Sequence, residues 1–348
     1  MRSQAWFIYA LGGGWGHLNR ALALTQVAAE QRPVHVLVNS PYAGQIPASA
    51  LSPNLFLHRL SAEASLSETR QAVHQHLARH LETTLIVDTF PRGLIGELAD
   101  WLPQSQSCRV LIHRDLNPNY IAAKNILAFA QQHYDGILLP GEYDVPLAGL
   151  PQVKQTAPWL SRSASALATP AVHLANFRTQ HAITRDRPLI LVCAAGKPSE
   201  LAFFGQLTMN LQAAFPQATV RCMAATCPPH CHPDYWFCHW PGIEAVSMAT
   251  VVVGGGGYNL IHECKALNRP LISFAFARRY DRQAKRIKTY GQLATTRADA
   301  IAQVGNYLQQ ARYSNWHAPT TVTYENGTVA AAAAIAQFAD KKYKSSRQ

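Results

Sequence analysis

Short apolar runs alternate with segments of helical periodicity along the first half of the chain. The apolar runs have the length of β-strands and occupy residues 6–11, 34–39, 55–60, 84–90, 109–113 and 136–140. The segments with helical patterns between them are 18–30, 67–80, 94–101 and 119–133. Apolar strands that alternate with helices indicate a parallel sheet covered by helices on both faces.

The alternation stops over residues 151–187 and then starts again. This stretch is rich in Pro, Ser, Ala and Arg and has weak periodicity, which favours a connection between domains. Beyond it we expect strands at 188–196, 218–223, 250–255 and 270–276, and helices at 199–214, 258–267, from 281 onward and at 328–340. The pattern therefore predicts an α/β protein with one domain over 1–157, a second over 158–327, and a C-terminal helix and basic tail over 328–348. Ligands of open α/β sheets bind beyond the carboxyl ends of the strands, so two such domains facing each other would enclose a cleft.

The composition narrows the class of protein. The chain has 348 residues, of which 48% are hydrophobic and 15% charged, as in a globular protein. No apolar run reaches the roughly 20 residues that span a bilayer. The opening segment MRSQAWFIYALGGG favours a first strand over a signal peptide. We therefore expect a cytoplasmic protein whose seven cysteines are reduced.

The positive charge lies in the second half of the chain. Residues 1–157 contain 11 Lys/Arg and 11 Asp/Glu, whereas residues 158–348 contain 20 and 9, so the whole net charge of +11 lies there. Such a half can attract a nucleotide diphosphate, a nucleic acid or an anionic membrane surface. The basic residues are most closely spaced within 278–288. They could bind such an anion, or they could equally form the solvent-exposed face of a helix. Because no interleaved aromatics or recognisable module accompany them, we expect no nucleic-acid partner.

A glycine-rich turn, LGGGWGHLNRALAL, links the first strand to the first helix at residues 11–24. It lacks the Gly-Lys-Ser/Thr of a Walker loop, and His17 stands where a dinucleotide fingerprint has its third glycine. A histidine at a helix start above the sheet edge suits a general base. The alternative is a hydrogen-bonded structural histidine at the helix cap.

A second glycine run, GGGGYNLIHE at 254–263, follows a strand and opens a helix. Backbone amides at a helix start suit a diphosphate, and the carboxylate of Glu263 could accept hydrogen bonds from both hydroxyls of a ribose. Asn259 lies near the cap of this helix. A tight βα turn alone would not require four glycines.

Two further loops in the second half carry polar groups. In ARRYDRQAKR (277–286), Asp281 and Gln283 could hold sugar hydroxyls while Arg278 or Arg279 neutralises phosphate, although Asp281 could equally cap a helix. In CAAGKP (193–198), Lys197 could face phosphate, and a purely structural turn is the alternative.

The order of these motifs resembles that of GT-B glycosyltransferases. A G-x-G-H loop near the N-terminus is followed by Gly-Gly…Glu and by an Asp-x-Gln loop in the second half. Among them, the chain is similar to bacterial predicted glycosyltransferases related to the lipid-linked peptidoglycan N-acetylglucosaminyltransferase, and VDTFPRGLIGEL (87–98) resembles the same group. The resemblance rests on about 60 residues. It indicates the fold more specifically than it indicates the substrate.

The resemblance implies two Rossmann-like domains facing each other across a cleft and a division of labour between them. The first domain would bind an acceptor, with His17 as the base and an Asp that orients it, for which Asp88 and Asp115 are the candidates. The expected acceptor-binding residues are Gly13, Gly14, Gly16 and Arg20. The second domain would bind a nucleotide-sugar, most simply a UDP-sugar, through Gly196, Lys197, Gly255, Gly256, Gly257, Tyr258, Asn259, Glu263, Arg278, Arg279, Asp281 and Gln283. The usual Asn-Ala after the Gln is replaced by Lys285-Arg286, which leaves the donor sugar open.

The expected reaction is an inverting, metal-independent transfer of a hexosyl or N-acetylhexosaminyl group to an acceptor hydroxyl. The sequence has no Asp-x-Asp, and Glu142-Tyr-Asp144 favours an ordinary loop, so we expect no metal cofactor. Residues 222–239 hold four cysteines and three histidines, but without paired C-x2-C spacing. We expect a Pro-rich loop there, with a zinc site as the alternative.

Other functions use the same fold. A nucleotide-sugar hydrolase or epimerase would need no acceptor, and a non-catalytic binding protein would need neither His17 nor Asp88. The acceptor could be a small molecule, a glycan or a lipid-linked molecule. A lipid-linked acceptor would bring the protein to the inner face of the membrane, although the sequence shows no strongly amphipathic anchor.

Overall fold

The computed structural model describes residues 4–168, 172–184, 186–313 and 323–345, which form two compact units. Unit 1 consists of Met1–Ser161, Arg279–Asp281 and Asn326–Gln348, and unit 2 of Arg162–Arg278 and Arg282–Glu325. The chain thus divides at Ser161, close to the predicted boundary after residue 157. The C-terminal segment expected to stand apart over 328–348 lies within unit 1.

Unit 1 is built on a seven-stranded parallel sheet in the order β3-β2-β1-β4-β5-β6-β7. Its strands are β1 (Trp6–Tyr9), β2 (Val34–Val38), β3 (Leu55–Arg59), β4 (Thr84–Asp88), β5 (Arg109–Ile112), β6 (Gly136–Pro140) and β7 (Val153–Thr156). The strand order reverses between β1 and β4. This is the topological switch point at which open α/β sheets bind ligands.

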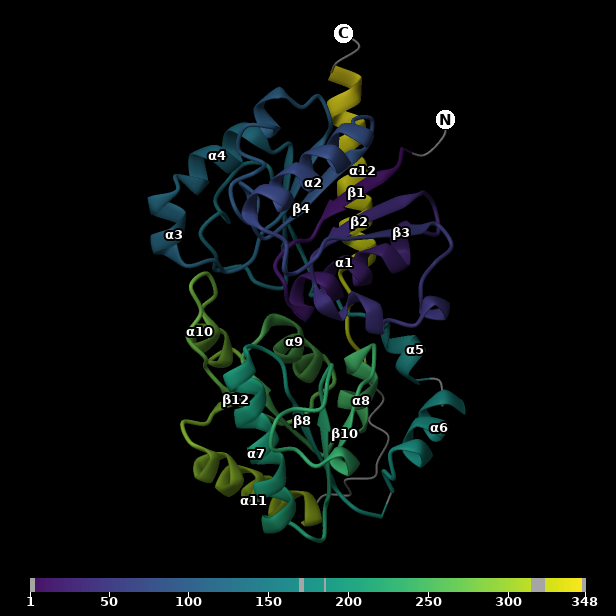
Figure 1. Ribbon diagram of the computed structural model, residues 1–348, viewed down its shortest axis with the longest axis vertical. Coiled ribbons are helices and arrows are strands. Elements are labelled where there is room, and N and C mark those ends of the chain that lie inside the picture. The colour runs from purple at the N-terminus through teal and green to yellow at the C-terminus, as the bar shows by residue number, and fades with distance from the viewer. Residues whose placement is uncertain (1–3, 169–171, 185, 314–322, 346–348) are drawn as a thin grey trace. The chain divides into compact units, whose positions relative to one another are not determined.

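Helices pack against this sheet (Figure 1). They are α1 (Trp15–Ala28), α2 (Leu66–Arg79), α3 (Pro118–Ala123), α4 (Ile126–His133) and α12 (Thr328–Ser345). Phe7 and Tyr9 of β1 belong to one apolar cluster with Val73 of α2 and Phe129 of α4. Helix α12 contacts α1, β6 and β7, so this C-terminal helix packs in the same unit as the N-terminal strands.

Unit 2 is built on a six-stranded parallel sheet in the order β10-β9-β8-β11-β12-β13. Its strands are β8 (Leu189–Cys193), β9 (Thr219–Met223), β10 (Trp236–Phe237), β11 (Val251–Gly255), β12 (Leu271–Phe274) and β13 (Gln292–Leu293). Its helices are α5 (Ala164–Ala168), α6 (Val172–Gln180), α7 (Pro198–Ala214), α8 (Gly242–Met248), α9 (Tyr258–Ala266), α10 (Gln283–Ile287) and α11 (Arg297–Tyr313). Here the switch point lies between β8 and β11.

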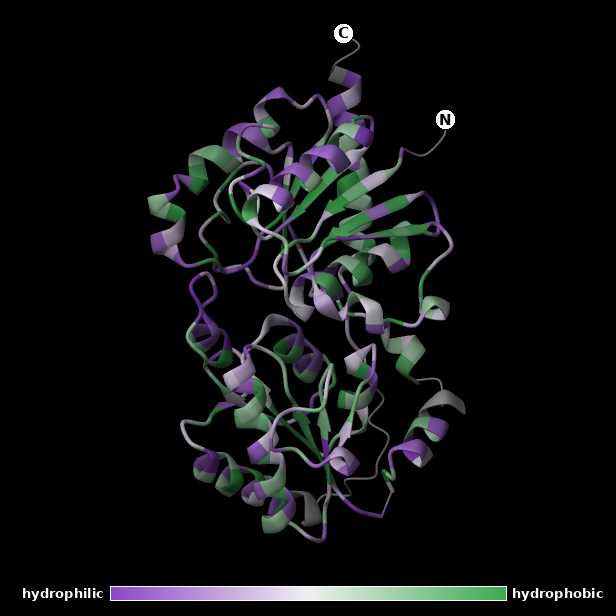
Figure 2. Cartoon of the chain, viewed as in Figure 1, coloured by the Kyte–Doolittle hydropathy of each residue, from purple (hydrophilic) through white to green (hydrophobic). Residues whose placement is uncertain are grey.

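The central strands of both sheets are apolar along their length, as a parallel sheet covered on both faces requires (Figure 2). All four residues of β1 and all five of β8 are buried. The predicted α/β architecture with two parallel sheets is therefore confirmed. None of the described helices combines the length and the apolar character needed to cross a membrane.

Two predicted helices differ from the structure. Residues 94–101 form successive turns, because Gly93 and Gly96 adopt positive φ angles of 84° and 90° that a helix cannot contain. The single helix expected over 119–133 is interrupted at Asn125, whose φ is 47°. The short strands β7, β10 and β13 were not predicted, since each has too few apolar residues to stand out in the sequence.

Candidate functional site

The switch point of unit 1 holds a buried ionic network centred on Asp88, the last residue of β4. Its carboxylate accepts hydrogen bonds from Arg20 Nε at 2.9 Å and from Arg20 Nη2 at 2.7 Å. His17 Nδ1 lies 2.6 Å from Oδ2 of the same carboxylate. Because an ionised carboxylate can only accept, His17 carries its proton on Nδ1 and keeps the lone pair of Nε2.

The local backbone explains why His17 lies there. Gly14 precedes α1 and provides no side-chain cap, so the helix begins openly at the carboxyl end of β1. A Cβ on Gly12 would lie 2.2 Å from the His17 ring, so only glycine allows the ring to lie over this loop. Asn39 Oδ1 accepts the N–H groups of Gly12 and Gly13 at 2.9 Å each and fixes the loop.

Burial and charge act against each other in this network. Burial alone would raise the pKa of Asp88, but Arg20 and His17 outweigh it and hold that pKa well below its usual range. Burial lowers the pKa of His17 from 6.5, although the Asp88 carboxylate opposes the shift. His17 is therefore a neutral, oriented imidazole near pH 7, with 13% of its side chain exposed.

The residues next to the network restrain it further. The ring of Phe90 stacks on that of His17 with centroids 5.4 Å apart. Thr89 has a φ of 72°, which is strained for a β-branched residue, and its hydroxyl accepts from Arg20 Nη2 at 3.1 Å. Strain of this kind persists where surrounding contacts over-determine the backbone, and it gathers at functional sites.

Two expectations for unit 1 are changed by this geometry. Of the two aspartates, Asp88 is the one beside His17, while the backbone N–H of Asp115 binds the carboxylate of Glu142 at 2.9 Å. Arg20 was expected to contact the acceptor, but it is 0% exposed and bound to Asp88. Its buried guanidinium therefore positions the Asp88 carboxylate and does not face a ligand. Gly13, Gly14 and Gly16 lie on the loop and first helical turn beside His17.

The switch point of unit 2 is formed mainly by backbone. Gly257 caps α9 with no side-chain hydrogen bond, and α9 has no acidic residue in its first turn. A Cβ on Gly254 would lie 2.4 Å from Leu260, and one on Gly256 would lie 2.7 Å from Ile287. These glycines therefore let neighbouring segments approach closely. The resulting helix N-terminus is suited to an anion.

Glu263 lies five residues into α9 and is 6% exposed. Burial raises its pKa to about 7, and no cation contributes an opposing shift. A buried carboxyl poised between its two forms near neutral pH is a feature of binding and catalytic sites. Of its neighbours on α9, Tyr258 is buried with its ring 4.4 Å from that of His262, and Asn259 is partly exposed.

The loop after β8 is joined to Arg278 through Glu200. Both guanidinium nitrogens Nη1 and Nη2 of Arg278 pair with the Glu200 carboxylate, which also accepts the Lys197 N–H at 3.2 Å. Gly196 has a φ of 131°, and a Cβ there would overlap Glu200. The predicted residues Gly196, Lys197 and Arg278 thus come together in unit 2, with Glu200 as their common partner.

The Asp-x-Gln loop is divided between the units. Asp281 pairs with Arg114 at 3.4 Å, and Arg279 accepts a hydrogen bond from Asn117, so both belong to unit 1. Gln283 stays in unit 2, where its Oε1 accepts the Phe276 N–H at 3.0 Å. The donor-binding role expected of Asp281 and Arg279 stays a prediction.

The Cys/His-rich segment, all of which the structure describes, brings the thiol of Cys231 next to those of Cys222 and Cys227, but it holds no group of three ligand atoms within 4.8 Å of one another. Cys227 Sγ donates to the Cys231 carbonyl at 3.5 Å, and Cys231 Sγ donates to that of His232 at 3.5 Å. Within the described part of the chain, a grouping of three ligand atoms occurs elsewhere, at three histidines of unit 1.

Several residues that contact predicted site residues were not predicted. Glu200 and Asn39 look like ordinary helix and loop residues in the sequence. Gly12 carried a signal because it belongs to the glycine run before His17, and Thr89 and Phe90 lie in the segment 87–98 that carries part of the resemblance, although neither was chosen as a site residue.

No protein-family model matches the chain, and no curated protein matches it in sequence. Solved structures match over nearly its whole length. The glycotransferase of kitacinnamycin gives a TM-score of 0.62 at 14% identity, covering 97% of this chain and 100% of that one. CalG4, the calicheamicin glycosyltransferase, gives 0.60 at 15%, covering 98% and 99%. Anabaena Alr3699/HepE, solved with UDP and glucose, gives 0.57 at 10%, covering 99% and 100%. The chain therefore has the GT-B fold, as its motifs indicated.

The state of His17 can be measured directly. In a pH titration of histidine-labelled protein by NMR, we expect His17 to titrate below 6.5 and to show the Nδ1–H tautomer. Asp88→Asn should lower the His17 pKa further, because the carboxylate that favours the imidazolium is lost. A wild-type pKa above 6.5, or an increase in Asp88→Asn, would contradict this electrostatic account.

Proposed function

We propose that the protein is a glycosyltransferase that moves a sugar from a nucleotide-diphosphate sugar to an acceptor hydroxyl. The observation that carries the proposal is the His17–Asp88 pair at the switch point of a GT-B unit. The imidazole is neutral, has a fixed tautomer and retains a lone pair on Nε2. A purely structural histidine would not need a buried carboxylate held ionised by an arginine.

The acceptor would be activated in unit 1. As the acceptor oxygen forms a bond to the anomeric carbon, its proton passes to His17 Nε2. The Asp88 carboxylate stabilises the imidazolium that results, while Arg20 keeps Asp88 ionised and in place. Attack opposite the departing diphosphate inverts the anomeric carbon. This direct displacement is the stereochemical outcome we propose.

The donor would be held in unit 2. The open N-terminus of α9 at Gly257 would bind the diphosphate, and charge that develops on the leaving oxygen would be stabilised there without a metal. Lys197 would supply positive charge from the loop after β8, and Arg278, paired with Glu200, would have to turn toward the phosphate to add its own. Glu263 would accept hydrogen bonds from the ribose diol.

We further propose a UDP-sugar with a hexosyl or N-acetylhexosaminyl group as the donor. One structure of the same fold was solved with UDP and glucose, and another is a UDP-glucosyltransferase from Polygonum tinctorium, which supports testing uridine nucleotides first. The acceptor class stays open among small molecules, glycans and lipid-linked molecules. A lipid-linked acceptor would place the protein at the inner face of the membrane.

His17→Ala should abolish transfer and spare donor binding. Loss of a general base costs roughly 10²–10⁴-fold in kcat, whereas the donor residues lie in unit 2. The measurement is sugar transfer under single-turnover conditions, together with the Kd of UDP. His133→Ala, on α4, is the matched control and should leave both unchanged. Full transfer by His17→Ala would refute the proposed base, and release of free sugar without acceptor would indicate a hydrolase.

Glu263→Gln should weaken nucleotide binding by about 10–100-fold, since a hydrogen bond to a charged group contributes about 1.5–3 kcal/mol. The hydroxyls favour the ionised carboxylate, so wild-type affinity should rise as the pH increases through about 7. Glu263→Gln should lose this dependence. Calorimetry with UDP and its 2′-deoxy and 3′-deoxy analogues tests the contact. Equal penalties for the analogues in both proteins would show that Glu263 does not bind the ribose.

A further inference from the structure

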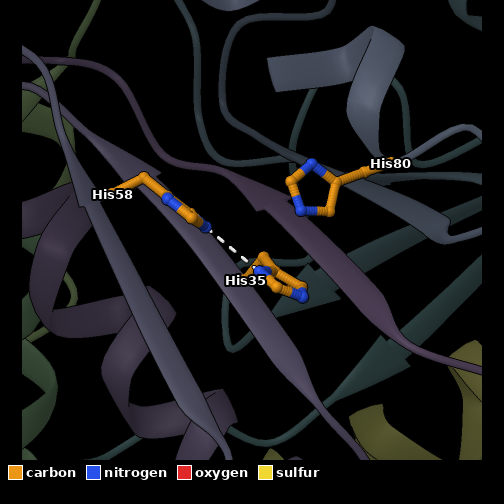
Figure 3. A group of neighbouring side chains, drawn as sticks. All are labelled: His35, His58 and His80. Carbon is orange, nitrogen blue, oxygen red and sulfur yellow. Dashed lines mark hydrogen bonds between the residues drawn. The ribbon is translucent and has the colours of Figure 1, made fainter.

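Unit 1 contains a group of histidines that the proposed transfer reaction does not use. His35 lies on β2, His58 on β3, and His76 and His80 lie at the end of α2 and just after it. Leu37 is the register partner of His58, and His35 that of Phe56, so the two strand histidines point to the same face of the sheet. Figure 3 shows the hydrogen-bonded rings of His35 and His58, with the ring of His80 nearby.

The geometry points to a binding site for a divalent transition-metal ion, which we propose is Zn²⁺, with His35, His58 and His80 as the ligands. One ring nitrogen from each lies within 4.8 Å of the others. In a tetrahedral site with Zn–N distances of about 2.0–2.1 Å, ligand nitrogens lie about 3.3–3.4 Å apart. Half-buried side chains need only small rotations to reach that geometry.

The two histidines on the strands, His35 and His58, are already close to the nitrogen spacing of a tetrahedral zinc site. His35 Nδ1 and His58 Nε2 are 3.0 Å apart, with a hydrogen bond between them. Binding a metal at both nitrogens requires that the shared proton move to the distal nitrogen of the same ring. That change is a tautomer exchange and releases no proton.

The third ligand has its tautomer fixed. His80 Nδ1 lies 2.7 Å from the His76 carbonyl oxygen, which can only accept, so Nδ1 carries the proton. The lone pair is then on Nε2. A backbone carbonyl that binds the distal N–H is the usual outer contact of a metal-binding histidine, and it raises the basicity of the ligand nitrogen.

The surroundings favour a metal ion that prefers nitrogen. Three imidazoles suit Zn²⁺, Cu²⁺ or Ni²⁺, whereas Mg²⁺ and Ca²⁺ require oxygen ligands. Burial, reinforced by the neighbouring imidazoles, keeps the pKa of His35 below its usual value and lowers that of His58 to about 4, so both rings are uncharged at neutral pH. The fourth position would take water or the ring of His76, whose centroid lies 4.8 Å from that of His58.

One cation opposes the site. The exposed Arg79, between His76 and His80, disfavours positive charge at His58 and His76. It should weaken metal binding without preventing it. This site is independent of the proposed transfer reaction and holds whether or not the protein transfers sugar.

The test is a calorimetric titration of the full-length chain, free of any histidine tag, with ZnCl₂ in a non-coordinating buffer. We expect one equivalent to bind. His58→Ala and His80→Ala should each weaken binding by at least about 100-fold, because loss of even an outer-shell partner costs about 10–100-fold. His133→Ala and Cys227→Ser should bind as the wild type does. No saturable binding by the wild type, or unchanged binding by both ligand variants, would overturn the proposal.

A second measurement does not depend on the variants folding. Co²⁺ added to the wild-type chain should give the visible spectrum of a four- or five-coordinate ion with nitrogen ligands only. A sulfur-to-cobalt charge-transfer band would show that the ion binds cysteine instead of the three histidines, and it would also overturn the proposal.

Discussion

The buried carboxylate of Asp88 is the constraint on which the first site depends. A carboxylate excluded from water is costly unless charged and hydrogen-bonding partners compensate it. Arg20 supplies one such partner from α1, and His17 supplies the other from the first turn of the same helix. The register between β1 and β4 therefore sets both the position and the tautomer of the imidazole. The strained backbone of Thr89 is tolerated in the same place because Arg20 binds its hydroxyl as well.

The candidate site at the switch point of unit 2 is built differently from that of unit 1. Instead of a buried ion pair with a neutral histidine, it has the uncapped N-terminus of α9 and a nearby loop in which Glu200 joins Arg278 to the segment containing Gly196. Backbone amides can bind an anion without the free-energy cost of burying a charged side chain. Glu263 is the exception, and its raised pKa reflects the burial of its carboxyl group. The side-chain site proposed for proton transfer and the backbone site proposed for phosphate thus lie on the same kind of sheet.

The sequence predicted the elements better than the partners. Strand positions and the two glycine turns follow from local patterns, and both lie where parallel sheets bind ligands. Arg20 was misassigned because a charged residue next to a glycine loop looks exposed, whereas only the fold brings it to Asp88, 68 positions away. The pairing of Asp281 with Arg114 was not predicted, because it spans 167 positions. The prediction of a helix over 94–101 was wrong because Gly93 and Gly96 have positive φ angles, which hydrophobic periodicity does not reveal.

The central claim is that unit 2 holds a nucleotide diphosphate for a reaction that His17 assists. Calorimetric titration of the full chain against nucleoside mono- and diphosphates and their sugars, with Mg²⁺ absent, tests it most directly. The account predicts that at least one diphosphate and its sugar bind with a Kd in the range of about 1 µM to 1 mM, while the matching monophosphate binds more weakly. Failure of every diphosphate and nucleotide-sugar to bind would contradict it.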